Sequence, residues 1–255
     1  MSLKIVQEPI YNQIDNTSSA FDNVVITGVD ELIAGSGNVV GHNQTTVYIQ
    51  FNGNVAVDVV STNTADTNSS GIGCKRIRVN GLFSDGGDSN KLKPRFAEFN
   101  MNGTTIVNSA YAGTNSFSVV NSVEMISNGT GNCNQGDITV KKTTTSSLMG
   151  FIKATYSKSH AFIYAVPCQS TLLIKDIHIS AFAQTACNLK IYTQHLNNGT
   201  RFLETQILIK DTTNHITHPV NLKVLENRSV YCEVIPLEAI TGSNFITINA
   251  SALLI

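Results

Sequence analysis

The sequence predicts an all-β protein with two β-sandwich domains, of jelly-roll or immunoglobulin-like type, and a short N-terminal arm. Three observations predict this class. Runs of Val, Ile, Thr, Phe and Tyr recur at short intervals, as in strands. Asn-Gly and Gly-rich turns separate these runs. No stretch keeps an apolar period of 3.6 residues over three turns, as an amphipathic helix would. About 15 strands are expected, which is more than one small sandwich holds.

The first 20 residues differ from the rest of the chain. Glu8-Pro9 and the polar run Asn16-Thr17-Ser18-Ser19 interrupt any strand pattern. We therefore expect residues 1–20 to form an arm that is either frayed or pinned on a neighbouring molecule. The chain has no apolar run long enough for a spanning helix, and its first residues lack the apolar region of a secretory signal. No membrane partner is expected.

Residues 21–145 are expected to form the first sandwich. Val55–Val59 has Val at every odd position, and within Cys74–Val79 the apolar Ile77 and Val79 alternate with Arg76 and Arg78. A period of two places one set in a core and the other in water. Turns are predicted at Asn52-Gly53, Asn80-Gly81, Asp85-Gly86-Gly87-Asp88, Asn102-Gly103 and Asn128-Gly129.

Residues 146–255 are expected to form the second sandwich. The boundary is marked by the polar, low-complexity run Lys141–Ser147, which follows a Gly- and Asn-rich segment. Beyond it the predicted strands are longer and more apolar. They are Phe162–Val166, Leu172–Phe182, Leu189–Tyr192, Phe202–Ile209, Ser229–Val234 and Phe245–Leu254.

The composition is low in charge. Charged residues make up 14% of the chain, whereas about 25% is usual. The 27 Asn, 26 Thr and 23 Ser keep the surface hydrated instead. With 42% hydrophobic residues and a net charge of -1, the chain lies outside the composition of disordered proteins. The near-neutral charge also argues against electrostatic binding of nucleic acid.

The cysteines are dispersed. They are at least 19 residues apart and form no Cys-x-x-Cys pair, so the sequence lacks the signature of a zinc cluster. We interpret Cys74, Cys133, Cys168, Cys187 and Cys232 as reduced, small apolar residues of a chain made in the cytosol. A disulfide among the last three stays open.

Catalytic motifs are absent from the sequence. It lacks the nucleophile elbow, the phosphate-binding loop, the dinucleotide-binding glycine motif and the His-Glu-x-x-His zinc motif. His215 and His218 would need a turn to share a metal, because positions three apart on a strand face opposite sides. We interpret them as solvated or edge residues, and His178 as a partly buried, hydrogen-bonded strand residue.

The carboxylates do not form a recognisable site. Asp85, Asp88 and Asp137 lie in Gly-rich loops, but without the spacing of a calcium-binding loop, so we interpret them as turn formers. No pair of carboxylates placed for glycoside hydrolysis is evident. The chain also has no Trp to stack on sugars. We therefore expect a non-enzymatic protein with no cofactor and no metal site.

One cationic cluster is the candidate contact site. Between residues 75 and 95 the sequence places six of its 17 cations, with Phe83 and Phe96 nearby. We rank a protein contact first, a solvated strand face second and nucleic acid third. The six residues are Lys75, Arg76, Arg78, Lys91, Lys93 and Arg95.

Several motifs occur in a fixed order that resembles a known family. They read S-x-x-x-x-D-T, G-x-G, I-x-V-x-G-L, M-N-G-T-T-x-V, N-x-G-D-I and Y-x-V-P-x-x-x-T. This order and spacing resembles virion structural proteins of marine and freshwater tailed phages and of some algal viruses. The residue after Cys168 is commonly Gly in that family, whereas here it is Gln169. The motifs occupy Ser61–Thr67, Gly71–Cys74, Ile77–Leu82, Met101–Val107, Asn134–Ile138 and Tyr164–Thr171.

The resemblance implies a non-enzymatic component of a virus particle. It implies a capsid decoration or cement subunit, or a head or tail appendage, made in the host cytoplasm and located in the virion. Its expected partners are copies of itself and the major capsid or tail proteins. The alternative is a receptor-binding fibre or tail module that contacts glycans through its Asn-, Thr- and Ser-rich loops. The resemblance implies no active-site residue.

Overall fold

The computed structural model describes residues 22–31, 38–39, 53–88, 91–109, 116–159, 162–182, 186–209, 214–237 and 245–255. Within them the chain forms strands β1–β17 and one 3-10 turn, η1 (Asp85–Gly87). All neighbouring strands are antiparallel. The predicted all-β class is confirmed.

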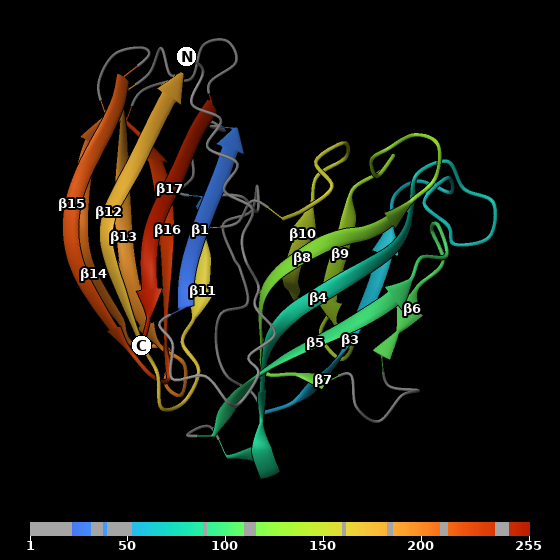
Figure 1. Cartoon of the computed structure of the whole chain (residues 1–255), viewed down its shortest axis with the longest axis horizontal. Helices are drawn as coiled ribbons and strands as arrows, with labels where there is room; N and C mark the ends of the chain where they lie inside the picture. The colour runs from blue at the N-terminus through green and yellow to red at the C-terminus, as the bar shows by residue number, and fades with distance from the viewer. Residues whose placement is uncertain are drawn as a thin grey trace.

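Two facing sheets form the part that we call the first sandwich (Figure 1). One sheet has the order β10-β9-β3-β6, with β7 also paired to β3, and the other has the order β5-β4-β8. Apolar residues from both sheets, such as Val59, Ile77 and Ile138, are fully buried between them. The strands are β3 (Val55–Ser61), β4 (Cys74–Ser84), β5 (Leu92–Asn100), β6 (Val107–Asn108), β7 (Ser116–Phe117), β8 (Val119–Asn128), β9 (Ile138–Lys142) and β10 (Leu148–Ile152).

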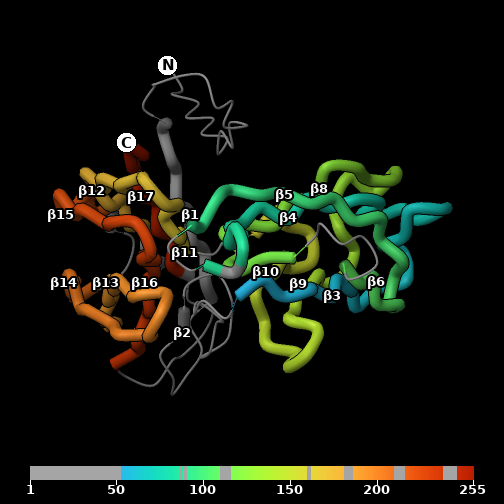
Figure 2. Tube along the Cα trace, turned by 90° about the horizontal axis from the view of Figure 1, so that it is seen from below, coloured from blue at the N-terminus to red at the C-terminus, as the bar shows by residue number. Residues whose placement is uncertain are grey.

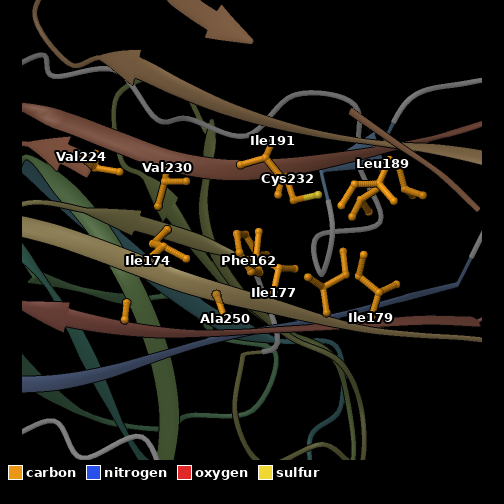
Figure 3. Close-up of a cluster of buried hydrophobic side chains, with 14 of the residues drawn as sticks. Phe162, Ile174, Ile177, Ile179, Leu189, Ile191, Val224, Val230, Cys232 and Ala250 are labelled. Carbon is orange, nitrogen blue, oxygen red and sulfur yellow. The ribbon is translucent and has the colours of Figure 1, made fainter. Parts of the chain in front are cut away.

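The second sandwich also has two sheets. Their orders are β1-β17-β12-β15 and β11-β16-β13-β14, with β2 also paired to β16. Alternate residues of the long strands, such as Ile177, Ile179, Leu189 and Ile191, fill the space between the sheets (Figure 3). The strands are β1 (Asp22–Glu31), β2 (Asn38–Val39), β11 (Ile163–Ala165), β12 (Thr171–Phe182), β13 (Cys187–His195), β14 (Arg201–Ile209), β15 (Asn214–Leu225), β16 (Arg228–Pro236) and β17 (Phe245–Leu254).

The two sandwiches lie side by side and share a small apolar cluster (Figure 2). Leu82, Leu92 and Val119 of the first sandwich pack there with Ala165 and Tyr231 of the second. All five are buried. One part of the β4–β5 hairpin therefore packs in the core of the first sandwich, and another part packs in the cluster between the two sandwiches.

Strand pairing divides the chain differently from the boundary expected near residue 145. β1 precedes the first sandwich in the sequence but pairs with β17, whereas β10 follows the expected boundary and pairs with β9. We therefore propose that the first sandwich consists of strands β3 to β10. The second combines β1 and β2 with strands β11 to β17. The predicted arm, residues 1–20, lies outside the described residues.

One turn prediction is wrong. Asn80-Gly81 lies inside β4, where the two residues pair with Phe96 and Arg95 of β5 in an unbroken register. The β4–β5 connection is instead made through η1, at the predicted Asp85–Asp88 turn. Gly81 is needed for packing, because a Cβ there would lie 2.1 Å from the carbonyl oxygen of Val119.

Among the described residues, no helix is long and apolar enough to cross a membrane.

Candidate functional site

The loops at one end of the first sandwich are tied to a single buried carboxylate, that of Asp66. Asp66 is fully buried. Its Oδ2 accepts hydrogen bonds from the Ser61 hydroxyl at 2.6 Å and from the Gly136 N–H at 2.9 Å. Its Oδ1 accepts from the N–H groups of Cys74 at 2.7 Å and Gln135 at 2.9 Å. We call these five residues the Asp66 hub.

The backbone of Asp66 adds a further loop to the hub. Its carbonyl accepts the N–H of Gly103 at 2.7 Å, and the Gly103 carbonyl accepts the N–H of Ser61 at 3.1 Å. Gly103 has φ +59 and packs on Thr64, so the predicted Asn102-Gly103 turn is confirmed. Two segments that are distant in sequence, at Gly103 and at Gln135–Gly136, thus meet the Ser61–Cys74 segment at Asp66.

A second buried polar residue, Asn134, extends the network to the loop after β10. Its Nδ2 donates to the carbonyls of Gly136 at 2.7 Å and Lys153 at 2.9 Å. Its Oδ1 accepts the N–H of Ser157 at 3.0 Å. Asp137 accepts the N–H of Ala154 at 2.8 Å. Its carboxylate therefore caps a loop, as expected for a turn former.

Glycines allow the hub to close. A Cβ on Gly73 would lie 2.1 Å from Oδ1 of Asp66, and one on Gly71 would lie 2.1 Å from the carbonyl oxygen of Ala65. A Cβ on Gly129 would lie 2.2 Å from the carbonyl oxygen of Gly71. Only glycine permits these approaches without movement of the backbone. Gly71 and Gly73 thus allow the loops around Asp66 to pack closely.

The hydrogen bonds of the Asp66 hub stabilise a buried charge. Four donors point at one buried carboxylate, and such hydrogen bonds stabilise its charge. The negative charge also raises the pKa of the neighbouring Cys74 thiol, although burial is the larger cause, and together they bring it to about 12. Asp66 thus binds the loops that surround it.

The cationic cluster is split by the structure into two groups. The first lies on the outer face of the β5-β4-β8 sheet. Arg76 and Arg78 of β4 both bind Glu98 of β5, at 2.6 and 2.8 Å. The Arg78 guanidinium also lies 5.1 Å from the ring centre of Phe96, which is 49% exposed. We call Arg76, Arg78, Phe96 and Glu98 the arginine strip.

The charges of the arginine strip are largely balanced. The hydrogen bond from Arg78 lowers the pKa of Glu98, and the nearby Arg76 charge adds to this effect. Glu124 of β8 lies 3.7 Å from Arg78. Lys75 is half-buried beside the strip. Carboxylates within reach of both arginines reduce the positive field that binding of nucleic acid requires.

The second group surrounds the β4–β5 turn. Lys93 binds Asp85 at 2.7 Å, and Lys91 lies 3.7 Å from Asp88. The hydrogen bond and charge of Lys93 lower the pKa of Asp85. Arg95 instead stacks 3.7 Å from the ring centre of Phe83. Desolvation lowers its pKa. These three cations therefore shape the hairpin and do not extend the arginine strip.

All five cysteines are free thiols in the structure. Cys74, Cys187 and Cys232 are buried, whereas Cys133 and Cys168 are half-buried. Burial raises the pKa of Cys187 to about 11 and that of Cys232 well above its ordinary value. Thiols with raised pKa are poor nucleophiles and metal ligands. These three cysteines pack as small apolar residues.

The histidines do not converge. His178 is half-buried and lies 3.1 Å from the Thr217 hydroxyl, which confirms the predicted hydrogen-bonded strand residue. His218 pairs with Ile177, one position along, so it lies on the other face of the sheet. The side chain of His215 is outside the described part. In the residues that the structure describes, no three His, Cys, Asp or Glu side chains are grouped to hold a metal.

Gln169, which stands where the resembled family commonly has Gly, lies in the turn after β11. Its φ is +59, the left-handed conformation that favours glycine. Gln169 thus occupies a backbone conformation that glycine adopts more readily than other residues. The N–H of Gln169 donates to the Glu226 carboxylate at 2.5 Å, which helps to hold the turn.

The sequence did not reveal Asp66 or Asn134 as site residues. Both lie in motifs of the resembled family, but small polar residues are so common in this chain that the residue type alone does not mark either position as buried. The available signal was the spacing itself: Ser61 precedes Asp66 by five residues, and Asn134 precedes the Gly136 carbonyl that it binds by two.

Comparisons with known proteins give little. No protein-family model matches the chain, and no curated protein matches it. Among solved structures, the chain is similar to the infectious bursal disease virus VP2 subviral particle, with 11% identity, a TM-score of 0.24, and coverage of 92% of this chain and 72% of that chain. The Gx strain structure of the same virus gives 11% identity, a TM-score of 0.24, and coverage of 94% and 74%. Similarity this low carries no conclusion.

Proposed function

We propose that the protein is a non-enzymatic structural component of a virus particle. Within that class, we propose a capsid decoration or cement subunit, or a head or tail appendage, that binds the capsid lattice or neighbouring subunits. The Asp66 hub is the observation that carries the proposal. It joins the resembling motifs around Asp66 in one hydrogen-bonded unit, which supports a common structural role for them.

The hub and the low charge suit a subunit packed at high copy number. Buried hydrogen bonds hold the loops of the first sandwich in one conformation without a metal or a disulfide. A net charge of -1 limits repulsion between neighbouring copies. The arginine strip supplies a polar surface with one exposed aromatic ring, a composition common at protein interfaces. We propose it as the contact with the lattice or with a neighbouring subunit.

Purified particles provide the test. Mass spectrometry of gradient-purified virions is expected to find the chain at a fixed copy number relative to the major capsid or tail protein. Recombinant protein should rebind to particles that lack it. Replacing Arg76 and Arg78 with Glu should weaken that rebinding, whereas Lys175→Glu, on an exposed position of β12, should not. Absence from purified particles would overturn the proposal.

A receptor-binding module is the second candidate. The hub fixes loops that expose Asn102, Thr104, Thr105 and Asn132, and rigid polar loops suit glycan contact. Binding of the isolated protein to a glycan array or to host cells, and competition with infection, would favour this candidate. A protein that binds particles but no glycan or cell would exclude it.

A further inference from the structure

Exposed edge strands need protection, because their unpaired N–H and C=O groups can pair with any other strand. Four long edge strands have described side chains: β5, β8, β14 and β15. Three of them are blocked by proline, by charged side chains or by a neighbouring segment. The fourth, β14, has an outer segment without any of these.

Two edges are blocked by residues within the strand. β5 contains Pro94, which has no N–H to donate, and the exposed Lys93 and Glu98. β15 contains the exposed Pro219 and Lys223, and its pairing with β12 is interrupted near Pro219. Proline and charge are common means of keeping an edge from pairing.

The β8 edge is blocked by a neighbouring segment. The Ser159 N–H donates to the Val123 carbonyl at 2.7 Å, and the Met125 N–H donates to the Ser157 carbonyl at 2.7 Å. The Ser159 hydroxyl accepts the N–H of Val123 at 2.9 Å. Residues 157–159 therefore occupy backbone groups that another strand would need.

β14 contains no proline and no lysine, and its exposed charged residues, Arg201 and Glu204, both lie before Thr205. No strand in the described part of the chain pairs with its outer side. Phe202 is 44% exposed, Leu203 52% and Leu208 57%. These are three of the nine large apolar side chains that are exposed among the described residues. β14 lies on the side of the second sandwich that is remote from the first, so the chain's own first sandwich does not cover it (Figures 1 and 2).

A bulge divides β14 into two parts. Ile191 of β13 pairs with Thr205 and the next residue, Tyr192, pairs with Leu203, so Glu204 is an extra residue. Beyond the bulge, Thr205–Ile209 is a regular segment with no charged side chain. Ile207 and Ile209 are buried in the second core, whereas Gln206 and Leu208 are exposed.

The segment Thr205–Ile209 is self-complementary. Its inward and outward positions alternate symmetrically about Ile207. An antiparallel copy centred on Ile207 would place Thr205 opposite Ile209 and Gln206 opposite Leu208, with inward residues meeting inward residues. No like charges would meet within the paired segment. An interface between two copies related by a twofold axis requires this kind of symmetry.

We propose that β14 is an assembly edge, and that Thr205–Ile209 pairs antiparallel with the same segment of a second copy. The β11-β16-β13-β14 sheet then continues across the twofold axis into the partner, and the buried Ile207 side chains of the two cores become neighbours. The proposal goes beyond the proposed function, because it concerns the isolated protein and does not need a capsid lattice.

The test measures the mass of the isolated protein in solution. Light scattering or sedimentation equilibrium across micromolar concentrations is expected to show a species of twice the 27.5 kDa chain mass. The double variant Gln206→Lys with Leu208→Lys would bring like charges into opposition across the axis. We expect it to weaken the dimer by about 100-fold. The control Leu225→Lys, at an exposed apolar position of β15, should leave the dimer unchanged.

A charge reversal tests the register. The variant Gln206→Glu with Leu208→Lys would place opposite charges across the axis, and it should restore a dimer that salt weakens. A wild-type mass of one chain at all concentrations would overturn the proposal. So would a dimer that persists in the Gln206→Lys, Leu208→Lys variant, or a failure of the charge reversal to restore it. Circular dichroism of each variant checks that the fold is intact. Particle binding is measured separately, so either proposal can fail alone.

Discussion

The two sandwiches are stabilised by different chemistry. In the second, long alternating strands bury Ile, Leu and Val, and two sheets close over one apolar core. In the first, an apolar core is completed at one end by hydrogen-bonded loops arranged around Asp66. The same chain thus uses strand alternation for one sandwich, and combines it with buried polar contacts for the other.

This difference explains the unusual composition. Asn, Ser and Thr are not simply substitutes for charge on the surface. Some, such as Ser61 and Asn134, are buried and hold loops together. A buried polar group is stabilising only when its hydrogen bonds are made. The first sandwich should therefore depend on a few specific contacts, and the second on the total apolar area that it buries.

Replacement of Asp66 should have the largest effect. In Asp66→Asn, an amide N–H₂ replaces one carboxylate oxygen and faces backbone N–H donors that then lack an acceptor. We expect a loss of about 4 kcal/mol in the free energy of unfolding. Urea unfolding measures it. The control Asp85→Asn, on the exposed β4–β5 turn, should change stability little. Equal losses of unfolding free energy in the two variants would contradict a stabilising role of the Asp66 hub.

Truncation in the second core should come next. Ile177→Ala removes a fully buried side chain between the two sheets of the second sandwich. We expect a cost of about 3 kcal/mol, from lost burial and the cavity left behind. The same unfolding measurement applies. Ile106→Ala, at a side chain that is 57% exposed, serves as the control and should be almost neutral. A near-zero effect of Ile177→Ala would argue against the continuous core.

A methyl group added at Gly73 should have a smaller cost. Its Cβ would lie 2.1 Å from Asp66 Oδ1, so the hub must shift. We expect Gly73→Ala to lower the free energy of unfolding by about 2 kcal/mol. Gly53→Ala is the matched control, because φ there is +71 but no atom lies within 4 Å; backbone strain alone should cost about 1 kcal/mol. If both variants lose the same free energy of unfolding, close packing at Gly73 does not explain the loss.

The smallest effect concerns Glu98 on the surface. Its pKa is lowered in the folded protein, so its contribution to stability is present at neutral pH and is lost as the pH falls through the lowered pKa. Carbon-13 NMR titration should place the midpoint below the ordinary value of 4.5. Arg78→Gln should raise it more than Arg76→Gln does, because the Arg78 hydrogen bond is the largest cause. The reverse order would contradict this geometry.

Local pattern predicted the strands but not their partners. The alternation in β3, β4 and β12 was readable because burial repeats every second residue. The pairing of β1 with β17 was not, since a strand pattern does not say which other strand it meets. The turn predicted at Asn80-Gly81 is wrong because the unbroken pairing of β4 with β5 outweighs the local turn preference of these two residues.

The candidate site was predicted only in part. The sequence grouped six cations by proximity, but strand geometry placed Arg76 and Arg78 on one face and brought Lys93 to Asp85 at the hairpin turn. Glu98 was not included, although the antiparallel register sets it opposite Arg78. Such partners are fixed by the fold, and a linear count of charges does not contain them.

The pairing of β1 with β17 has a consequence for synthesis of the protein. β1 emerges from the ribosome first among the described strands, yet its partner, with Asp22 opposite Leu254, is translated last. Until then none of the other described strands lies beside β1 in its sheet, whereas all the described strands of the first sandwich have been made. The first sandwich can therefore fold during translation, while the second must wait for the chain to be almost complete. Chaperone protection should matter most in that interval.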